Sequence, residues 1–205
     1  APAAGRGAPG AARGGAGRGG AQGDYASLPT QPSLQPWAQE KSAAMTNIDD
    51  PTVHCLLPGV PRVVGLPFPF QIVQTPKDVF ILYEVFHAFR IIPVDGRPPV
   101  GEALPSFMGD SVGHWEGDTL VVEVKNFNGK IWGPGNMKVT SDAYSVVERY
   151  TPNGNTISYE AKIEDPKVLN GPFVYRATMQ RPSETAIREY ECLENNIDLP
   201  HLGGR

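Results

Sequence analysis

Three side chains able to move a proton lie close together near the middle of the chain. They are Asp110, His114 and Glu116. A carboxylate beside an imidazole can act as a general acid or base, so these are the candidate catalytic residues. The other interpretation is structural, with Asp110 capping a turn and Glu116 on a solvated face. Ser111 lacks the Gly-x-Ser-x-Gly context of an activated nucleophile, so we assign no catalytic residue.

Metal and cofactor sites are not indicated by the remaining reactive residues. The four histidines are scattered along the chain: His54, His87, His114 and His201. None has the H-x-x-x-H spacing of a zinc site, and neither cysteine belongs to a C-x-x-C pair. The chain also has no calcium-loop spacing and no phosphate-binding glycine loop after a strand. We therefore expect no metal and no cofactor.

The formal net charge of −4 and the distribution of apolar residues limit the partners. A negative chain is not attracted to nucleic acid, and no apolar run approaches the roughly 20 residues that span a bilayer. We expect other protein chains as partners, chiefly copies of this one, with no nucleic acid and no membrane span. A complex at a membrane surface stays open as a partner.

Residues 1–23 form an arm of Gly, Ala, Pro and Arg. The arm has no large apolar side chain, so it cannot build a core and is expected to be disordered on its own. Its three basic residues are Arg6, Arg13 and Arg18. We expect the arm to cross to another chain, where main-chain hydrogen bonds and these arginines hold it on acidic groups.

Several aromatic residues lie on loops and proline-broken edges rather than inside strands. They are Trp37, Phe68, Phe70, Phe127 and Trp132. Core packing is one explanation for them. A subunit interface is the other, because exposed aromatics are favoured interface anchors, and Trp37, Phe68, Phe70 and Trp132 are its candidates.

The regular elements begin after the arm. Residues 24–50 are predicted to be a linker with one short helix over 36–45, residues 51–196 a β domain and residues 197–205 a polar tail. In the β domain, a strand–turn–strand unit over 113–124 is the strongest signal, because Gly117 supplies a tight turn before a run of β-branched residues. The period of two places Val121 on the opposite face from Leu120 and Val122, so the three are not buried together unless both sheet faces are covered.

Turn residues divide the rest of the β domain into short strands. The predicted strands cover residues 60–65, 68–75, 78–85, 86–92, 143–150, 155–163, 173–180 and 186–192. We expect Asn153-Gly154 to form a hairpin turn. About eight to ten short strands, joined mostly in sequence, predict a mainly β fold that is either an antiparallel up-and-down barrel or a curled sandwich.

Cys55 and Cys192 stand at the two ends of the β region. The sequence also starts with small residues, Ala-Pro-Ala-Ala, as mature ends do after signal-peptide cleavage. We therefore expect export to the periplasm or the medium, and a disulfide between the two cysteines. Two buried free thiols are the alternative.

Four motifs carry a resemblance over roughly residues 50–196. They are Pro58-Gly-Val-Pro-Arg62, Phe68-Pro-Phe-Gln-Ile-Val-Gln-Thr-Pro76, Gly113-His-Trp-Glu-Gly-Asp-Thr-Leu-Val-Val122 and Tyr190-Glu-Cys-Leu-Glu-Asn-Asn196. In this order they resemble a family of uncharacterised exported bacterial proteins. The resemblance implies export and a β fold, and no activity. Relatives often have His in place of Asp110 and before the Glu148-Arg149 pair, so any histidine site there is lost here.

Two functions follow from these observations. The first is a non-enzymatic, exported structural subunit that joins an assembly, a filament of identical subunits or a membrane-surface complex, through its arm. The second is a small-molecule-binding barrel, or an enzyme, with its site near Asp110, His114 and Trp132. Contact between the arm and another copy favours the first, and a hollow interior favours the second.

Overall fold

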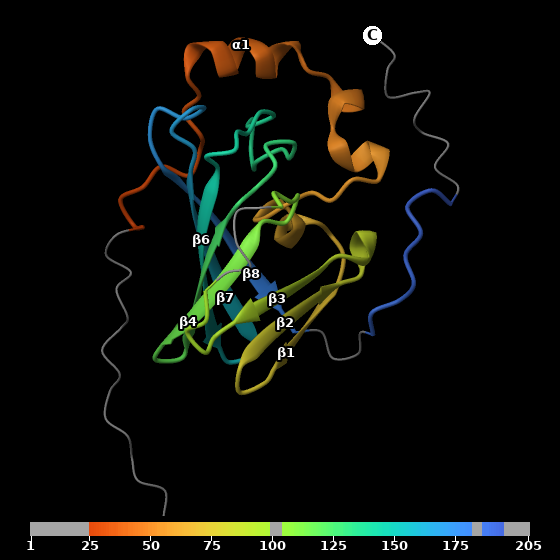
Figure 1. The fold of residues 1–205 in the computed structure, drawn as a ribbon, viewed down its shortest axis with the longest axis vertical. Coiled ribbons are helices and arrows are strands. Elements are labelled where there is room, and N and C mark those ends of the chain that lie inside the picture. The colour runs from red at the N-terminus through yellow and green to blue at the C-terminus, as the bar shows by residue number, and fades with distance from the viewer. Residues whose placement is uncertain (1–24, 99–103, 182–185, 195–205) are drawn as a thin grey trace, which may run out of the picture.

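The fold is mainly β, with two antiparallel sheets and one α-helix in the residues described, 25–98, 104–181 and 186–194 (Figure 1). The structure is a computed structural model. Its smaller sheet has the order β1-β2-β3 and its larger sheet the order β4-β5-β6-β7-β8. Neither sheet closes on itself within these residues, so the predicted curled sandwich describes the fold and the closed barrel does not.

The elements have the following bounds. The small sheet contains β1 Phe70–Gln74, β2 Asp78–Tyr83 and β3 Phe89–Pro93. The large sheet contains β4 Asp110–Glu116, β5 Thr119–Lys125, β6 Ser145–Asn153, β7 Thr156–Glu164 and β8 Phe173–Gln180. The helix is α1 Pro36–Ala44, and the short 3-10 helices are η1 Asn47–Asp49, η2 Pro51–His54, η3 Arg62–Gly65 and η4 Val85–His87.

Most predicted elements are present, and two predicted strands are wrong. Residues 60–65 form a 3-10 turn, because Pro61 has no N–H to give a sheet and the amides of Val63 and Val64 bond back to Gly59 and Pro61. Residues 186–192 form no strand and run as an irregular strap. The strap ends at a disulfide between Cys55 and Cys192, with an S–S distance of 2.08 Å, as predicted.

The core lies between the two sheets. The inner face of the small sheet contributes Val79, Ile81 and Ile92, and the large sheet contributes alternate residues of its central strands. These are Leu120, Val122, Val124, Val146, Tyr150, Tyr159, Ala161 and Ile163. On β7 the buried residues Tyr159, Ala161 and Ile163 alternate with partly exposed ones, as the period of two requires.

Val121 is buried together with Leu120 and Val122, so the predicted alternation on β5 is wrong at this position. Val121 pairs with His114 on one side and Arg149 on the other. Arg149 reaches across β5 to Glu116, with Nη2 2.9 Å from Oε2. This ion pair and the His114 ring cover the outer face of β5, so both of its faces are covered here.

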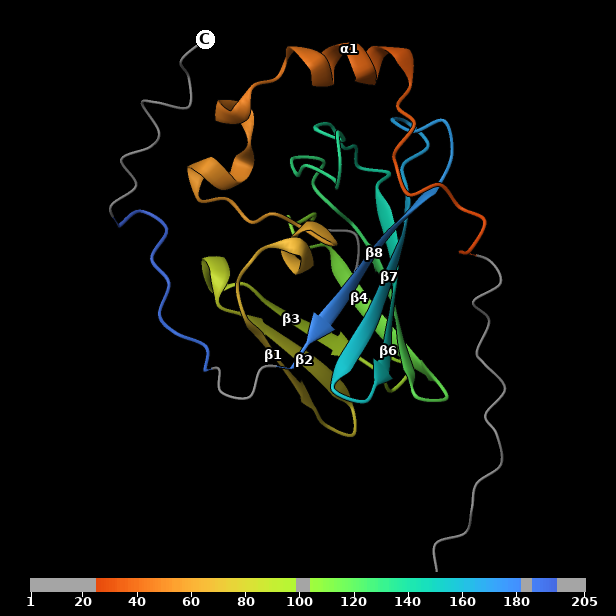
Figure 2. The same ribbon diagram turned by 180° about the vertical axis from the view of Figure 1, so that it is seen from behind.

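The helix and the small sheet lie at opposite ends of the molecule (Figures 1 and 2). The loop after β5 packs under α1, where the Ser42 hydroxyl donates to the carbonyl of Asn136 at 2.8 Å and Lys138 Nζ to that of Met45 at 2.7 Å. None of the described helices is long and apolar enough to cross a membrane.

Candidate functional site

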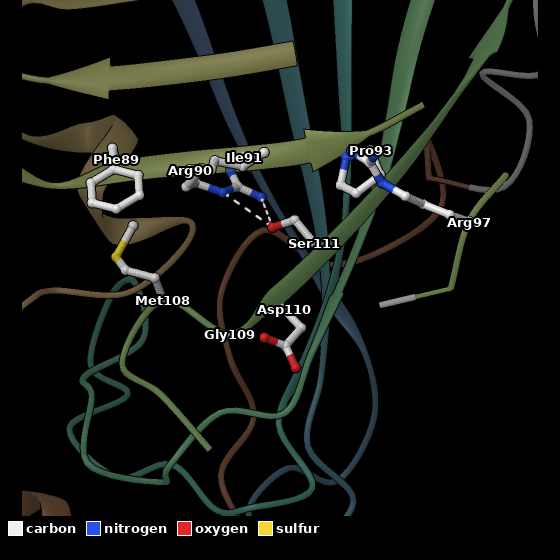
Figure 3. A pocket seen from close by; sticks show the side chains of 9 residues that line it. All are labelled: Phe89, Arg90, Ile91, Pro93, Arg97, Met108, Gly109, Asp110 and Ser111. Carbon is white, nitrogen blue, oxygen red and sulfur yellow. Dashed lines mark hydrogen bonds between the residues drawn. The ribbon is translucent and has the colours of Figure 1, made fainter. Parts of the chain in front are cut away.

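A pocket opens where the edge strands of the two sheets diverge, between β3 and β4 (Figure 3). The strands touch at Gly113, where a Cβ atom would stand 2.9 Å from Ile92 and 3.2 Å from Val94. Towards Phe89 and Met108 they separate and leave a volume of about 320 Å³. Ligand pockets span roughly 300–1,000 Å³, so this one suits a single long side chain or a small molecule.

The pocket walls are apolar and its floor is polar. Phe89, Ile91, Pro93 and Met108 supply the walls. Arg90 and Ser111 lie between them, with the Arg90 guanidinium directed at the Ser111 hydroxyl (Figure 3).

Arg90 belongs to a buried ion pair that joins the two sheets. Its side chain is 2% exposed and that of Glu148 is fully buried. Nη1 lies 3.1 Å from Glu148 Oε1 and Nη2 lies 2.5 Å from Oε2, which is a bidentate arrangement. Burial lowers the pKa of Arg90, but the charge of Glu148 outweighs it and the net pKa is raised. Arg90 therefore stays charged. Glu148 balances that charge, so the floor of the pocket is neutral in sum.

Two tyrosines complete the coordination of Glu148. The hydroxyls of Tyr150 and Tyr159 donate to Oε1 at 2.8 Å and 2.7 Å. Burial, and then the charge of Glu148, raise the pKa of both phenols well above 10, so they remain donors. The carboxylate is thus satisfied on both oxygens, and the arrangement favours a structural role over proton transfer.

Ser111 is a hydrogen-bond donor to the pocket. Its oxygen accepts from Arg90 Nε at 3.3 Å and from Nη2 at 2.9 Å. A hydroxyl has two acceptor lone pairs and one hydrogen. Because Arg90 takes the acceptor side, the hydrogen of Ser111 is left for an acceptor in the pocket.

Asp110 is the acidic group of the pocket. It is half-buried, and its Oδ2 accepts from the side-chain amide of Asn126 at 2.8 Å. No basic side chain in the described part of the chain lies within ion-pair distance of Asp110. Lys125, which stands opposite Asp110 on β5, lies 3.3 Å from Glu123 instead.

Arg97 lines the opening of the pocket and brings two carboxylates close to it. It is paired with Asp78, and its Nε lies 3.6 Å from Asp95. Asp110 in the lining and these two partners beside it make three carboxylates against one guanidinium. Since Glu148 neutralises Arg90, the field at the opening favours a positively charged ligand.

The structure does not bring the predicted acid–base residues into one site. Asp110 and His114 are four residues apart on one strand, roughly 13 Å. His114 lies instead 3.4 Å from Glu116 on the outer face, where both side chains are exposed. The hydrogen bond from Arg149 is the main reason that the pKa of Glu116 is lowered. With Arg149, this pair covers the outer face of β5.

Trp132 is also separate from the pocket. The ring is half-buried in the loop after β5, between the Arg62 guanidinium at 5.7 Å and the Lys138 ammonium at 5.3 Å. It is not among the residues that line the pocket with Asp110. The two cation–π contacts are intramolecular, and the interface role of Trp132 stays a prediction.

The other predicted interface residues are only partly exposed. Trp37 is 47% exposed, and its Nε1 donates to the carbonyl of Lys167 at 3.2 Å. Phe68 is 36% exposed and packs edge-on against Tyr190 at 5.4 Å, and Phe70 packs against Tyr83 at 5.6 Å. The arginines of the arm, Arg6, Arg13 and Arg18, and His201 lie outside the described residues.

An exposed apolar surface was missed by the sequence reasoning. The pairs Val73–Phe80, Leu82–Phe89 and Phe80–Ile91 place these residues on the outer side of the small sheet. We call the four exposed ones the apolar face: Val73 39%, Leu82 38%, Phe89 62% and Ile91 49%. The continuous apolar run over 78–83 was its signal, since such a strand has apolar residues on both sides.

Comparison with known proteins adds no assignment, because no family model, no curated protein and no solved structure matches this chain.

Proposed function

We propose that this protein is an exported, non-enzymatic structural subunit that assembles with copies of itself. The observation that carries the proposal is the apolar face. It is continuous with the pocket, because Phe89 and Ile91 belong to both. A contiguous apolar patch of a few hundred Å² is often a functional surface, and this supports a contact with another protein.

The size of the apolar face indicates that it does not act alone. An aromatic side chain presents about 150–250 Å² and the aliphatic ones less, so the face exposes roughly 300 Å² per copy. A stable interface buries about 1,200 Å² or more in total. A further contact is needed, and the arm of residues 1–23 of a second copy is long enough to supply it.

Charge is segregated between arm and body in the way such a contact requires. The arm has three arginines and no acidic residue, so the rest of the chain is three units more negative than the −4 of the whole. Two positive arms repel each other, and so do two negative bodies, whereas the arm of one copy attracts the body of another. This favours contact between the arm of one copy and the body of the next.

Export from the cytoplasm is the part of the proposal that the disulfide supports. The Cys55–Cys192 bond closes a separation of 137 residues and is compatible with an oxidising compartment. The periplasm and the extracellular medium both satisfy it.

A second candidate function is small-molecule binding. The pocket between β3 and β4 favours it, with Asp110 and Ser111 on apolar walls. Of the three residues expected at such a site, only Asp110 lies there.

The test is the mass of the full-length protein in solution, by light scattering over a concentration series. We expect species larger than the 22.1 kDa chain, and a shift to monomer in Phe89→Ser and Ile91→Thr. Leu104→Ser is the matched control, because Leu104 is 80% exposed and lies off the apolar face. A wild-type chain that stays monomeric at all concentrations contradicts the proposal.

A further inference from the structure

The pocket between β3 and β4 has the chemistry of a site for an arginine side chain. Asp110 offers a carboxylate that forms no ion pair among the described residues, because Lys125 opposite it lies 3.3 Å from Glu123, and the two carboxylates paired with Arg97 add negative charge beside the opening. Phe89 and Met108 offer apolar walls that suit the methylene stem of a long basic residue. The Ser111 hydrogen suits a carbonyl next to that stem.

The free edge of β3 offers main-chain groups beside the pocket. Hydrogen bonds from Tyr83 N to Ala88 O and from Val94 N to Lys77 O fix the bonded pairs between β2 and β3. Because bonded and non-bonded pairs alternate in an antiparallel ladder, Arg90 and Ile92 point their main-chain groups at β2. Those of Phe89 and Ile91 therefore face the edge that borders the pocket.

These features together describe an extended segment with an arginine and small neighbours. The main chain of such a segment adds to a strand edge without needing large side chains. Each arginine of the arm has small neighbours on both sides: Gly5-Arg6-Gly7, Ala12-Arg13-Gly14 and Gly17-Arg18-Gly19. No bulky side chain hinders the approach of any of them to the narrow seam between two strands.

We propose that an arginine from residues 1–23 of a second copy binds in this pocket. Its guanidinium pairs with Asp110, its stem lies between Phe89 and Met108, and the arm runs along the free edge of β3. The proposal rests on the proposed function and names the contact by which one copy holds the next. The arm then also lies beside the apolar face, because Phe89 and Ile91 border both.

The test uses a synthetic peptide of residues 1–23 with a fluorescent label, titrated with full-length protein. The receptor carries Arg6→Gln, Arg13→Gln and Arg18→Gln, so its own arm does not compete. We expect binding that weakens about tenfold or more in Asp110→Asn, since a charge-assisted pair is lost. Asn at this position can still accept from Asn126, so the variant keeps the local fold, which circular dichroism checks.

Two controls isolate the pocket from the overall charge. Asp118→Asn removes an equal charge in the β4–β5 turn and should bind the peptide like the receptor. A peptide with Gln at all three arginines should not bind. Equal affinity of the Asp110→Asn and Asp118→Asn receptors overturns the proposal.

The experiments distinguish an error in the arginine pocket from an error in the proposed function. If wild-type protein assembles and Asp110→Asn assembles equally well, the arginine pocket is wrong and the structural subunit stands. If wild-type protein is monomeric at all concentrations, assembly itself is wrong, whatever the peptide does.

Discussion

Glu148 collects four donors without access to solvent. Arg90 gives two hydrogen bonds, and Tyr150 and Tyr159 give one each. A buried charge with too few partners destabilises the fold by several kcal/mol. Removing any one donor from Glu148 is therefore expected to lower the free energy of unfolding. The floor of the pocket is rigid for this reason, and Arg90 holds Ser111 in one orientation.

The tyrosines around this pair differ in a testable way. The Tyr83 hydroxyl is buried beside Arg90 and Tyr150, and among the described residues it makes no hydrogen bond of ordinary geometry. Burial raises the pKa of Tyr83 to about 12. Tyr83→Phe removes an unsatisfied group and should leave the free energy of unfolding unchanged or raise it by up to about 1 kcal/mol. Tyr159→Phe removes a satisfied donor and should lower it by about 1–3 kcal/mol.

Urea denaturation at neutral pH measures both variants, with wild type in the same series. The decisive result is which of the two variants has the lower free energy of unfolding. A Tyr83→Phe protein less stable than Tyr159→Phe would mean that the Tyr83 hydroxyl is bonded.

This ion pair could not be found from the sequence. Arg90 and Glu148 are 58 positions apart, and only the crossing of β3 over the large sheet brings them together. On β3, the pattern Phe89-Arg90-Ile91 would place the charge outside and the apolar residues inside. The structure has the reverse, with Arg90 buried and Phe89 and Ile91 exposed. Asp110, in contrast, was a candidate from the start because its type alone suggests chemistry.

At the scale of elements, local turn chemistry was predictable and strand ends were not. The β4–β5 hairpin follows from Gly117, whose φ is 59°, and β8 covers the predicted residues 173–180. The β6–β7 turn lies at Gly154-Asn155, one residue later than expected. The strap over 186–192 is not the predicted strand, because contacts with distant residues hold it in place of a sheet ladder.

The strap is held by the packing of an aromatic ring, by a hydrogen bond to a carboxylate and by the disulfide. Tyr190 packs edge-on between Phe68 at 5.4 Å and Phe86 at 5.5 Å. The amide of Arg188 donates to Glu84 Oε2 at 2.8 Å. The strap thereby ties the end of the chain to the β2–β3 turn, which borders β3 and hence the pocket.

Removing the disulfide should therefore loosen more than the strap. Cys55→Ser with Cys192→Ser releases a loop of 137 residues, and the chain-entropy estimate of the loss is about 4–5 kcal/mol. The free energy of unfolding, from guanidinium denaturation, measures it. Reduced wild-type protein should match the double variant, and a loss below about 1 kcal/mol would show that the strap carries no stability.

At the scale of the whole molecule, the proposed contact between the arm and the pocket joins unlike surfaces. Such a contact closes a dimer where two copies exchange arms, and otherwise gives a ring or an open filament. Its electrostatic part also weakens as salt screens it, with a Debye length of about 10 Å at 0.1 M and about 3 Å at 1 M. Assembly should thus grow with protein concentration and decline as salt is added.

The unlike surfaces predict a specific result when two full-length variants are mixed. A chain with Arg6→Gln, Arg13→Gln and Arg18→Gln keeps its pocket and loses its arm contact, while Asp110→Asn keeps its arm and weakens its pocket. Each should be monomeric alone. Mixed in equal amounts, one intact arm meets one intact pocket, so the assembly should stop at a heterodimer of about twice the 22.1 kDa chain mass. Native mass spectrometry with one variant isotopically labelled distinguishes this from homodimers. Filaments in the mixture, or homodimers of either variant alone, would show that the copies meet through like surfaces, with the apolar face on its own symmetry mate.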